Sequence, residues 1–141
     1  MSRIYWDTML FVYLFEGHAE FGPQVRRIHQ KMLRRGDTLC TSMFTVGESL
    51  SGPFKRNQPE IAKRLKDYFQ SNEIELVPFT WETAEAYARL RSENSILPAD
   101  AIHLASAADA RSDLFLTNDH KLQRLRVPGI QFIAGLDGKL F

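Results

Sequence analysis

The chain has 141 residues, of which 44% are hydrophobic and 25% charged, and it carries a formal net charge of +1. These values exclude wholesale disorder and give no overall electrostatic signature of a nucleic-acid-binding protein, although a local basic patch would be enough to bind RNA. Because Cys40 is the only cysteine and no run approaches the roughly 18 uncharged residues that span a bilayer, we expect a single soluble, cytoplasmic domain over residues 1–141.

The first half of the chain alternates short apolar runs, typical of buried strands, with amphipathic segments, typical of helices. Two residues mark helix ends, since Gly36 suits a C-terminal cap and Ser42 can cap a helix N-terminus. We expect residues 51–59, SGPFKRNQP, to form a loose segment. In chain order, the expected elements are a strand at residues 3–6, helices at 9–15 and 22–35, a strand at 38–41 and a helix from 43 to about 50.

The second half continues the same alternation. Pro59 opens an amphipathic helix, Thr80 can cap the next, and Pro98 stands at the start of a third. Short apolar strands that alternate with helices predict an α/β three-layer fold, in which a parallel sheet is covered on both faces. In chain order, the expected elements are a helix at residues 59–69, a strand at 74–79, helices at 81–93 and 98–111, a strand at 114–117, a brief helix at 121–125 and a strand at 130–133.

Four acidic residues stand where this fold would bring them to one place. Asp7 follows the first strand and Asp119 the fourth, whereas Glu48 lies on the helix after the second strand and Asp100 comes two residues after Pro98. In α/β folds, ligands bind beyond the carboxyl ends of the strands. If the first and fourth strands are neighbours, Asp7 and Asp119 share one sheet edge, and the two helices direct the other acids into the same crevice.

Each of these acids is flanked by apolar or small residues and not by cations. Carboxylates that converge without cations repel and raise one another's pKa, which a hard cation such as Mg²⁺ or Mn²⁺ relieves. A metal therefore explains a carboxylate at Asp7, inside the apolar run RIYWDTMLFVYLF. Taken singly, each acid also has an ordinary explanation: a helix cap for Asp7, a solvated helix position for Glu48, a first helical turn for Asp100 and a turn for Asp119.

Four segments resemble the motifs of the PIN domain family, in the family's order: IYWDTMLFVYLF, TSMFTVGES, LPADAIHLASA and LFLTND. The resemblance runs from Arg3 to about Phe132. It implies a compact α/β/α sandwich with a five-stranded parallel sheet and an Mg²⁺- or Mn²⁺-dependent ribonuclease activity. The site residues that it implies are the acids Asp7, Glu48, Asp100 and Asp119, with Thr8 and Asn118 as supporting polar groups.

Stand-alone chains of this length resemble VapC-type toxins, which pair with a small antitoxin and commonly form homodimers. The resemblance therefore implies an antitoxin partner and a dimer. One departure is the aromatic pair Tyr5 and Trp6, because many such toxins begin with a plain aliphatic strand. Two alternatives stay open: a PIN nuclease outside any toxin–antitoxin pair, and a catalytically silent PIN-like module that binds RNA or protein. Acids at all four positions argue against the silent module.

The expected chemistry is hydrolysis of RNA phosphodiester bonds, which needs an activated water and a cation to take up charge on the phosphate. Asp7 and Asp100 are the expected primary ligands. Asp119 would serve a second or substrate-assisted metal, and Glu48 would be a water-mediated ligand or an orienting residue. We expect His103, three residues after Asp100, to have a packing or hydrogen-bonding role.

RNA also requires cations that meet its phosphates, although each candidate alone is more simply a solvated surface charge. Aromatic residues at helical spacing predict a core or a dimer surface before stacking on RNA bases, namely Phe44, Phe54, Tyr68, Phe69, Trp81 and Tyr87. The first four are the main candidates for a dimer surface. The candidate RNA contacts are Lys55, Arg56, Lys121 and Arg124, with further cations at Lys63, Arg64 and Lys66 and a denser group at Arg26, Arg27, Lys31, Arg34 and Arg35.

Two other enzyme classes also place an Asp after an apolar first strand. Aspartyl-phosphate phosphatases require a second Asp two positions further on, where this chain has Met9. Receiver domains require an acidic pair at the first strand end and an acceptor Asp on a central strand, and the chain has neither. Both classes are therefore rejected.

Overall fold

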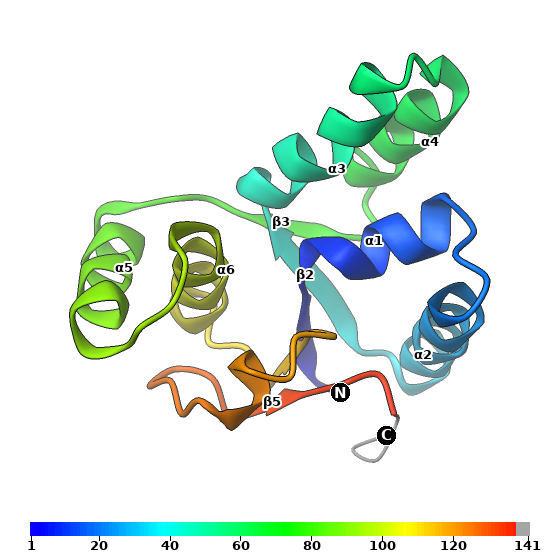
Figure 1. Cartoon of the computed structure of the whole chain (residues 1–141). Helices are drawn as coiled ribbons and strands as arrows, with labels where there is room; N and C mark the ends of the chain where they lie inside the picture. Colours follow the sequence, from blue (N-terminus) through cyan, green and yellow to red (C-terminus); the bar gives the residue numbers. More distant parts are fainter. Residues whose placement is uncertain (138–141) are drawn as a thin grey trace.

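A five-stranded parallel sheet forms the centre of the computed structural model, which describes residues 1–137 (Figure 1). The strand order is β3-β2-β1-β4-β5, and every neighbouring pair is parallel. The strands are β1 (Arg3–Trp6), β2 (Thr38–Ser42), β3 (Glu75–Val77), β4 (Leu114–Leu116) and β5 (Phe132–Ala134).

Helices cover both faces of this sheet. In Figure 1, α5 and α6 lie together on one side and α1 and α2 on the other, while α3 packs against α4. A separate hydrophobic cluster fills the space on each face, so the predicted α/β/α sandwich is confirmed. None of the helices within residues 1–137 combines the length and hydrophobicity of a membrane span. The helices are α1 (Thr8–Phe15), α2 (Phe21–Arg35), α3 (Met43–Lys55), α4 (Pro59–Phe69), α5 (Trp81–Glu93) and α6 (Pro98–Asp109), with a 3-10 turn at Leu122–Arg124.

Strand β1 is buried on both faces, which explains its unbroken apolar sequence. Successive side chains of a strand point to opposite faces. Accordingly, Ile4 and Trp6 belong to the cluster beneath α1 and α2, whereas Tyr5 belongs to the cluster beneath α5 and α6. The ring of Phe115 in β4 stacks on that of Tyr5, with centroids 5.2 Å apart. The side chain of Tyr5 is thus held between Phe115 of β4 and His103 of α6.

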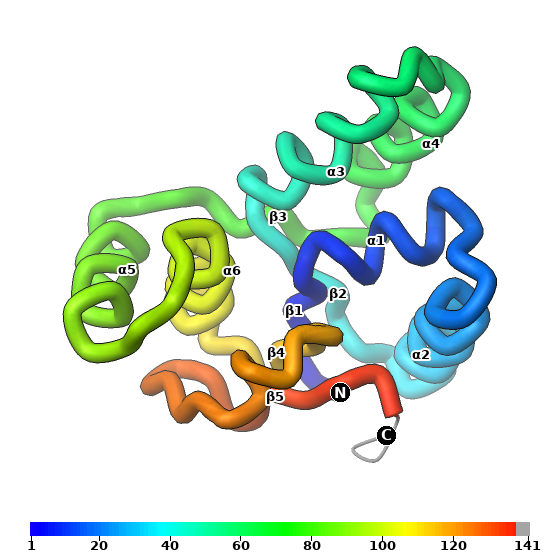
Figure 2. Tube along the Cα trace, in the orientation of Figure 1, coloured from blue at the N-terminus to red at the C-terminus, as the bar shows by residue number. Residues whose placement is uncertain are grey.

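The order of the strands reverses between β1 and β4, which are labelled side by side in Figure 2. After β1 the chain adds β2 and β3 on one side, and then crosses to add β4 and β5 on the other. The register pairs Ile4 with Leu114 and Trp6 with Leu116. The first and fourth strands are therefore neighbours, and such a reversal leaves a crevice beyond their carboxyl ends.

The predicted helix ends are present. Gly36 ends α2 in the left-handed conformation at φ 74°, which glycine adopts without strain. The hydroxyl of Ser42 accepts a hydrogen bond from the backbone N–H of Thr45 at the start of α3. Thr80 and Thr83 form a reciprocal capping box at the start of α5. Each of these local signals located one end of a helix correctly.

Helix α3 continues to Lys55, so the prediction of a loose segment over residues 51–59 is wrong for most of its length. Pro53 lies inside the helix, where it has no N–H to donate to the carbonyl of Ser49. Its ring is buried and α3 packs against α4, so tertiary contacts continue the helix past the proline. The chain leaves the helix only near Asn57, which has a positive φ of 52°.

The last strand lies further along the chain than the predicted range of 130–133. Gly129 adopts φ 99°, and the N–H of Ile130 donates to the carbonyl of Val127 at 3.1 Å. Ile130 is therefore part of a turn, although its side chain is buried as a strand residue would be. The apolar residues of this turn therefore resembled a strand in the sequence, because a buried turn and a buried strand both require apolar side chains.

The four aromatic residues that predicted a core or a dimer surface divide between core and exterior. Phe69 is 3% exposed and belongs to the core, and Tyr68 packs against that core. Phe44 is partly buried, whereas Phe54 is 59% exposed. A dimer surface therefore does not include Phe69, and the homodimer itself stays a prediction.

Candidate active site

A cavity of about 320 Å³ lies beyond the carboxyl ends of β1 and β4. Its walls come from the start of α1, from α3, from the first turns of α6 and from the segment after β4. The structure thus brings together side chains from four distant parts of the sequence. They include all the acids and both supporting residues predicted from the sequence, namely Asp7, Thr8, Glu48, Asp100, Asn118 and Asp119.

Asp7 is the N-cap of α1 and at the same time a wall of the cavity. Its Oδ1 accepts a hydrogen bond of 2.7 Å from the backbone N–H of Thr8, and its Oδ2 accepts one of 2.8 Å from the Thr117 hydroxyl. These donors and the positive end of the helix dipole stabilise a carboxylate within an apolar segment. The helix-cap explanation is therefore correct for Asp7, and it leaves the carboxylate next to the cavity.

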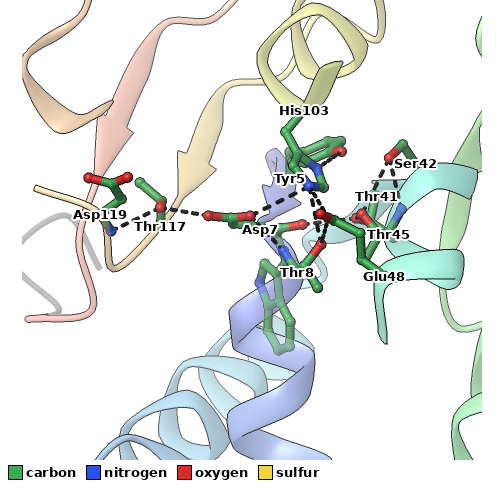
Figure 3. A network of polar contacts seen from close by, with 11 residues as sticks. Tyr5, Asp7, Thr8, Thr41, Ser42, Thr45, Glu48, His103, Thr117 and Asp119 are labelled. Atoms are coloured by element: carbon green, nitrogen blue, oxygen red, sulfur yellow. Dashed lines mark hydrogen bonds and ion pairs between the residues drawn. The ribbon is translucent and has the colours of Figure 1, made fainter. Parts of the chain in front are cut away.

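Glu48 is more than a solvated helix position. Its Oε1 accepts a hydrogen bond of 2.6 Å from the Thr8 hydroxyl and lies 2.7 Å from Nε2 of His103 (Figure 3). Burial alone would raise the pKa of Glu48, but the hydrogen bonds to His103 and Thr8 lower it below its ordinary value. Glu48 is thus held as a carboxylate beside the cavity.

Asp100 lies in the first turn of α6. Burial, followed by the charges of Asp7 and Asp119, raises the pKa of its carboxyl above the ordinary value. No protein group among residues 1–137 donates a hydrogen bond to this carboxylate, in contrast to the carboxylates of Asp7 and Glu48. Of the acids in the cavity, Asp100 is the one whose charge most needs a cation.

Thr117 is a site residue that the sequence did not reveal. It is fully buried at the end of β4, and its hydroxyl donates to Asp7 Oδ2 and accepts a hydrogen bond of 3.0 Å from the backbone N–H of Asp119. One hydroxyl therefore fixes acids that stand 112 positions apart in the chain. Beside it, Nδ2 of Asn118 donates to the Tyr13 hydroxyl at 3.2 Å, which ties this segment to α1.

His103 is 2% exposed and also lines the cavity. Its Nδ1 lies 2.8 Å from the Tyr5 hydroxyl, and its Nε2 lies close to Glu48 Oε1 and to the Thr8 hydroxyl, at 2.7 and 3.1 Å. The hydrogen-bonding role expected from the sequence is correct. The available signal was its position one helical turn after Asp100, whereas its contact with Tyr5 gave no signal in the sequence.

A family model for the PIN domain matches residues 4–128 of the chain. The chain belongs to the PIN domain family. Its structural neighbours include VapC toxins and toxin–antitoxin complexes, as the sequence motifs implied. No curated protein sequence gives a match.

Three solved structures share the fold of this PIN domain at low sequence identity. VapBC2 from Rickettsia felis, bound to a DNA fragment from its promoter, has a TM-score of 0.75 and 20% identity, with 94% of this chain and 98% of that chain covered. A toxin–antitoxin complex from Klebsiella pneumoniae has a TM-score of 0.67 and 22% identity, with coverages of 90% and 94%. VapC20 from Mycobacterium tuberculosis, a sarcin-ricin loop cleaving toxin, has a TM-score of 0.67 and 14% identity, with coverages of 79% and 86%.

The acids of this PIN domain suit a hard divalent cation in their chemistry. Carboxylate oxygens are the preferred ligands of Mg²⁺ and Mn²⁺, and the raised pKa of Asp100 reflects its burial and then the negative charges of Asp7 and Asp119, which a cation would neutralise. Within residues 1–137, no three His, Cys, Asp or Glu side chains are already grouped closely enough to form a metal site. The chemistry of the carboxylate donors fits the ion. Because they are not yet grouped closely, binding would require the side chains to move closer together.

The cations predicted to contact RNA lie outside the cavity of this PIN domain. Arg56 forms an ion pair of 2.7 Å with Glu16, and Lys55 is exposed at the end of α3. Lys121 and Arg124 are exposed on the segment after Asp119, and the backbone N–H of Lys121 donates to Asp119 Oδ1 at 2.9 Å. Lys121 is thus the predicted cation that stands next to an acid of the site.

Proposed function

We propose that this PIN domain is an Mg²⁺- or Mn²⁺-dependent endoribonuclease, and that it is the toxin of a toxin–antitoxin pair. The observation that supports the nuclease is the convergence of Asp7, Glu48, Asp100 and Asp119 on one cavity at the reversal of strand order. In a PIN domain, an acidic cavity at this place fits a metal-assisted hydrolase better than a module that only binds.

Asp7 and Asp100 would hold the metal directly, Asp119 would join them when substrate is present, and Glu48 would act through a water molecule. A bound divalent cation would supply an activated water and would stabilise negative charge on the phosphate. Thr8 and Thr117 orient the carboxylates of Glu48 and Asp7 by hydrogen bonds of 2.6 and 2.8 Å. The protein itself supplies no nucleophile in this scheme.

The test is digestion of defined RNAs with Mg²⁺, with Mn²⁺ and with a chelator. We expect cleavage with either metal and none with the chelator. Asp7→Asn should lower the rate by at least ~100-fold, because loss of a charged ligand removes several kcal/mol of transition-state stabilisation. Asparagine is also a good N-cap, so the variant should keep α1 intact.

The matched control is Glu93→Gln, which neutralises an exposed acid on α5 that lines neither the cavity nor the groove beside Phe54. It should cleave RNA like the wild type. An RNA that binds to the wild type but is never cut, with either metal, would contradict the nuclease and favour the silent binding module.

Two structural neighbours whose assemblies are known support the toxin role. The Rickettsia felis and Klebsiella pneumoniae structures are toxin–antitoxin complexes, and this chain shares their fold over nearly its whole length. The role requires a short open reading frame for an antitoxin that precedes or overlaps this gene. Without such a reading frame, the PIN nuclease outside a toxin–antitoxin pair becomes the better proposal.

We also expect a homodimer, in which the exposed ring of Phe54 is buried. The ring borders a groove of about 390 Å³ between the end of α3 and α4, and a large exposed aromatic side chain of this kind is a frequent interface anchor. Light scattering at micromolar concentration should give about twice the monomer mass. Phe54→Ser should weaken the dimer by roughly 30-fold.

The control for the dimer is Trp81→Ser on α5, which removes another exposed aromatic ring and should leave the mass unchanged. A wild-type mass near the 16.2 kDa of one chain would contradict the dimer.

A further inference from the structure

Tyr5 and His103 form a polar pair in the hydrophobic layer between the sheet and α6. Tyr5 is fully buried and His103 is 2% exposed, and the hydroxyl of one lies 2.8 Å from Nδ1 of the other. Phe115 stacks on the tyrosine ring, and Phe44 packs edge-on against the imidazole with ring centroids 5.4 Å apart. Both rings are therefore held in one orientation by packing.

The hydrogen-bond partners of the imidazole define where its proton is. The Glu48 carboxylate accepts hydrogen bonds and has none to donate, so Nε2, which lies 2.7 Å from Oε1, must carry a hydrogen. A tyrosine hydroxyl is protonated at neutral pH and can donate to Nδ1. With the hydrogen on Nε2, Nδ1 can accept from the Tyr5 hydroxyl, and the Thr8 hydroxyl, at 3.1 Å from Nε2, can accept from it while donating to Glu48. Asp7 Oδ1 also faces Nε2, at 3.7 Å.

We propose that His103 is a positioning residue that holds the Glu48 carboxylate in its working orientation, and that Tyr5 anchors the imidazole in that place through Nδ1. This inference rests on the proposed metal-dependent activity. The imidazole and Thr8 both engage Oε1 of Glu48, which leaves Oε2 without a protein donor within residues 1–137. Oε2 is thus available to a water or a cation in the cavity.

An imidazole suits this place beside an acidic cavity. Its Nε2–H donates to Glu48 Oε1 from a ring that is fixed by packing, whereas a Lys or Arg at this position would also orient Glu48 but would carry a permanent positive charge that competes with the metal for the carboxylates. The pair also gives a reason for the aromatic Tyr5 in a strand position where related toxins often carry an aliphatic residue.

The first test measures the tautomer in the wild-type protein without metal, by ¹⁵N NMR of the imidazole. We expect a protonated Nε2 and an unprotonated Nδ1 for His103. In Tyr5→Phe, which removes only the hydroxyl, we expect the hydrogen to stay on Nε2, where Glu48 requires it, and the Nδ1 resonance to shift because its hydrogen bond is lost. A hydrogen on Nδ1 in the wild type, or an Nδ1 resonance that is unchanged in Tyr5→Phe, would overturn the role of Tyr5.

The second test measures Mn²⁺ affinity by calorimetry. His103→Leu should bind Mn²⁺ about 10- to 100-fold more weakly, which is the usual effect of removing a group that orients a ligand. His103→Gln, whose amide can place an N–H near the position of Nε2, should recover most of the affinity. In cleavage assays, kcat should fall in His103→Leu while KM for RNA stays unchanged. Ser106→Ala, which removes another buried polar group from α6 that does not line the cavity, is the control and should change neither quantity.

The outcomes separate this inference from the proposed function. If the wild type binds Mn²⁺ and cleaves RNA but His103→Leu equals it in affinity and kcat, the positioning role is wrong and the nuclease stands. If the glutamine variant is as impaired as the leucine variant although both fold, the imidazole acts by more than orientation and the inference is also wrong. If the wild type binds no Mn²⁺, the proposed function fails and this inference fails with it.

Discussion

Replacing Asp100 with asparagine should abolish RNA cleavage and leave the metal-free protein at least as stable as the wild type. Burial and the charges of Asp7 and Asp119 raise the pKa of the Asp100 carboxyl, so its ionised form costs free energy in the folded state when no cation is present. Asparagine has nearly the same shape without the charge. The substitution therefore removes a metal ligand and a source of repulsion together.

The effect of Asp100→Asn on stability should depend on pH in a defined direction. Because the folded-state pKa is raised, the protonated carboxyl favours folding, and this contribution is lost as the pH rises from about 3.9, the ordinary value for Asp, through the folded-state value. Asparagine does not titrate. The variant should therefore exceed the wild type in melting temperature at neutral pH, and the difference should disappear below pH ~3.9.

Thermal unfolding in a chelator, at neutral and at acidic pH, measures this effect. We expect a rise of about 1–4 °C at neutral pH, because the carboxylate is only partly buried and a change of 1 kcal/mol shifts a domain of this size by a few degrees. Millimolar Mg²⁺ should raise the melting temperature of the wild type and not that of the variant.

Glu82→Gln is the control for this prediction, because Glu82 occupies the first turn of α5 as Asp100 occupies the first turn of α6. Loss of a charge that favours the helix dipole should make that variant slightly less stable. A large loss of stability in metal-free Asp100→Asn would show that Asp100 is mainly a structural first-turn acid, and would count against the metal site.

The antitoxin that we propose should lose affinity for this protein as Mg²⁺ is added. An acidic cavity without its metal attracts a cation, and arginine is the side chain best suited to contact carboxylates in pairs. We therefore expect the partner to direct an Arg or Lys at Asp7, Asp100 and Asp119. The double variant Asp7→Asn, Asp100→Asn should bind the partner at least ~30-fold more weakly, as expected when a buried charge pair loses one side.

Calorimetry with the purified partner, at several Mg²⁺ concentrations and constant ionic strength, measures both effects. Glu93→Gln again serves as the control, because it removes an exposed charge outside the cavity and outside the groove beside Phe54. An affinity that is indifferent to Mg²⁺ and to the double substitution would show that the inhibitor binds away from the acidic cavity.

The strand pattern and the strand-end acids were predictable because both depend on local sequence. Apolar runs of strand length located β1 and β4. Asp7 stands directly after β1, and Asp119 follows β4 after Thr117 and Asn118. In a parallel sheet, the carboxyl ends of neighbouring strands meet at one edge. Only the adjacency of β1 and β4 had to be assumed, and their register confirms it.

The remaining features of the site depend on contacts between residues far apart in the chain. Tyr5 contacts His103, and Thr117 contacts Asp7, across separations of 98 and 110 residues. The hydrophobic periodicity that identifies strands and helices, two or 3.6 residues, carries no information about such pairs. The prediction that α3 ends before Pro53 was wrong for a similar reason, because the packing of α3 against α4 outweighs the local preference for a break. Local patterns therefore predicted the positions of the acids, whereas tertiary contacts determine how those acids are held.

The sheet order also has a consequence for the moment at which the cavity forms during synthesis. A ribosome that has made β1, β2 and β3 has completed one side of the sheet, and Asp7, Glu48 and Asp100 precede β4 in the chain. The cavity still lacks Thr117, which fixes Asp7, and Asp119, until β4 has been added beside β1. The acidic centre therefore assembles only when most of the chain has left the ribosome, and a prematurely terminated product that ends before β4 lacks it.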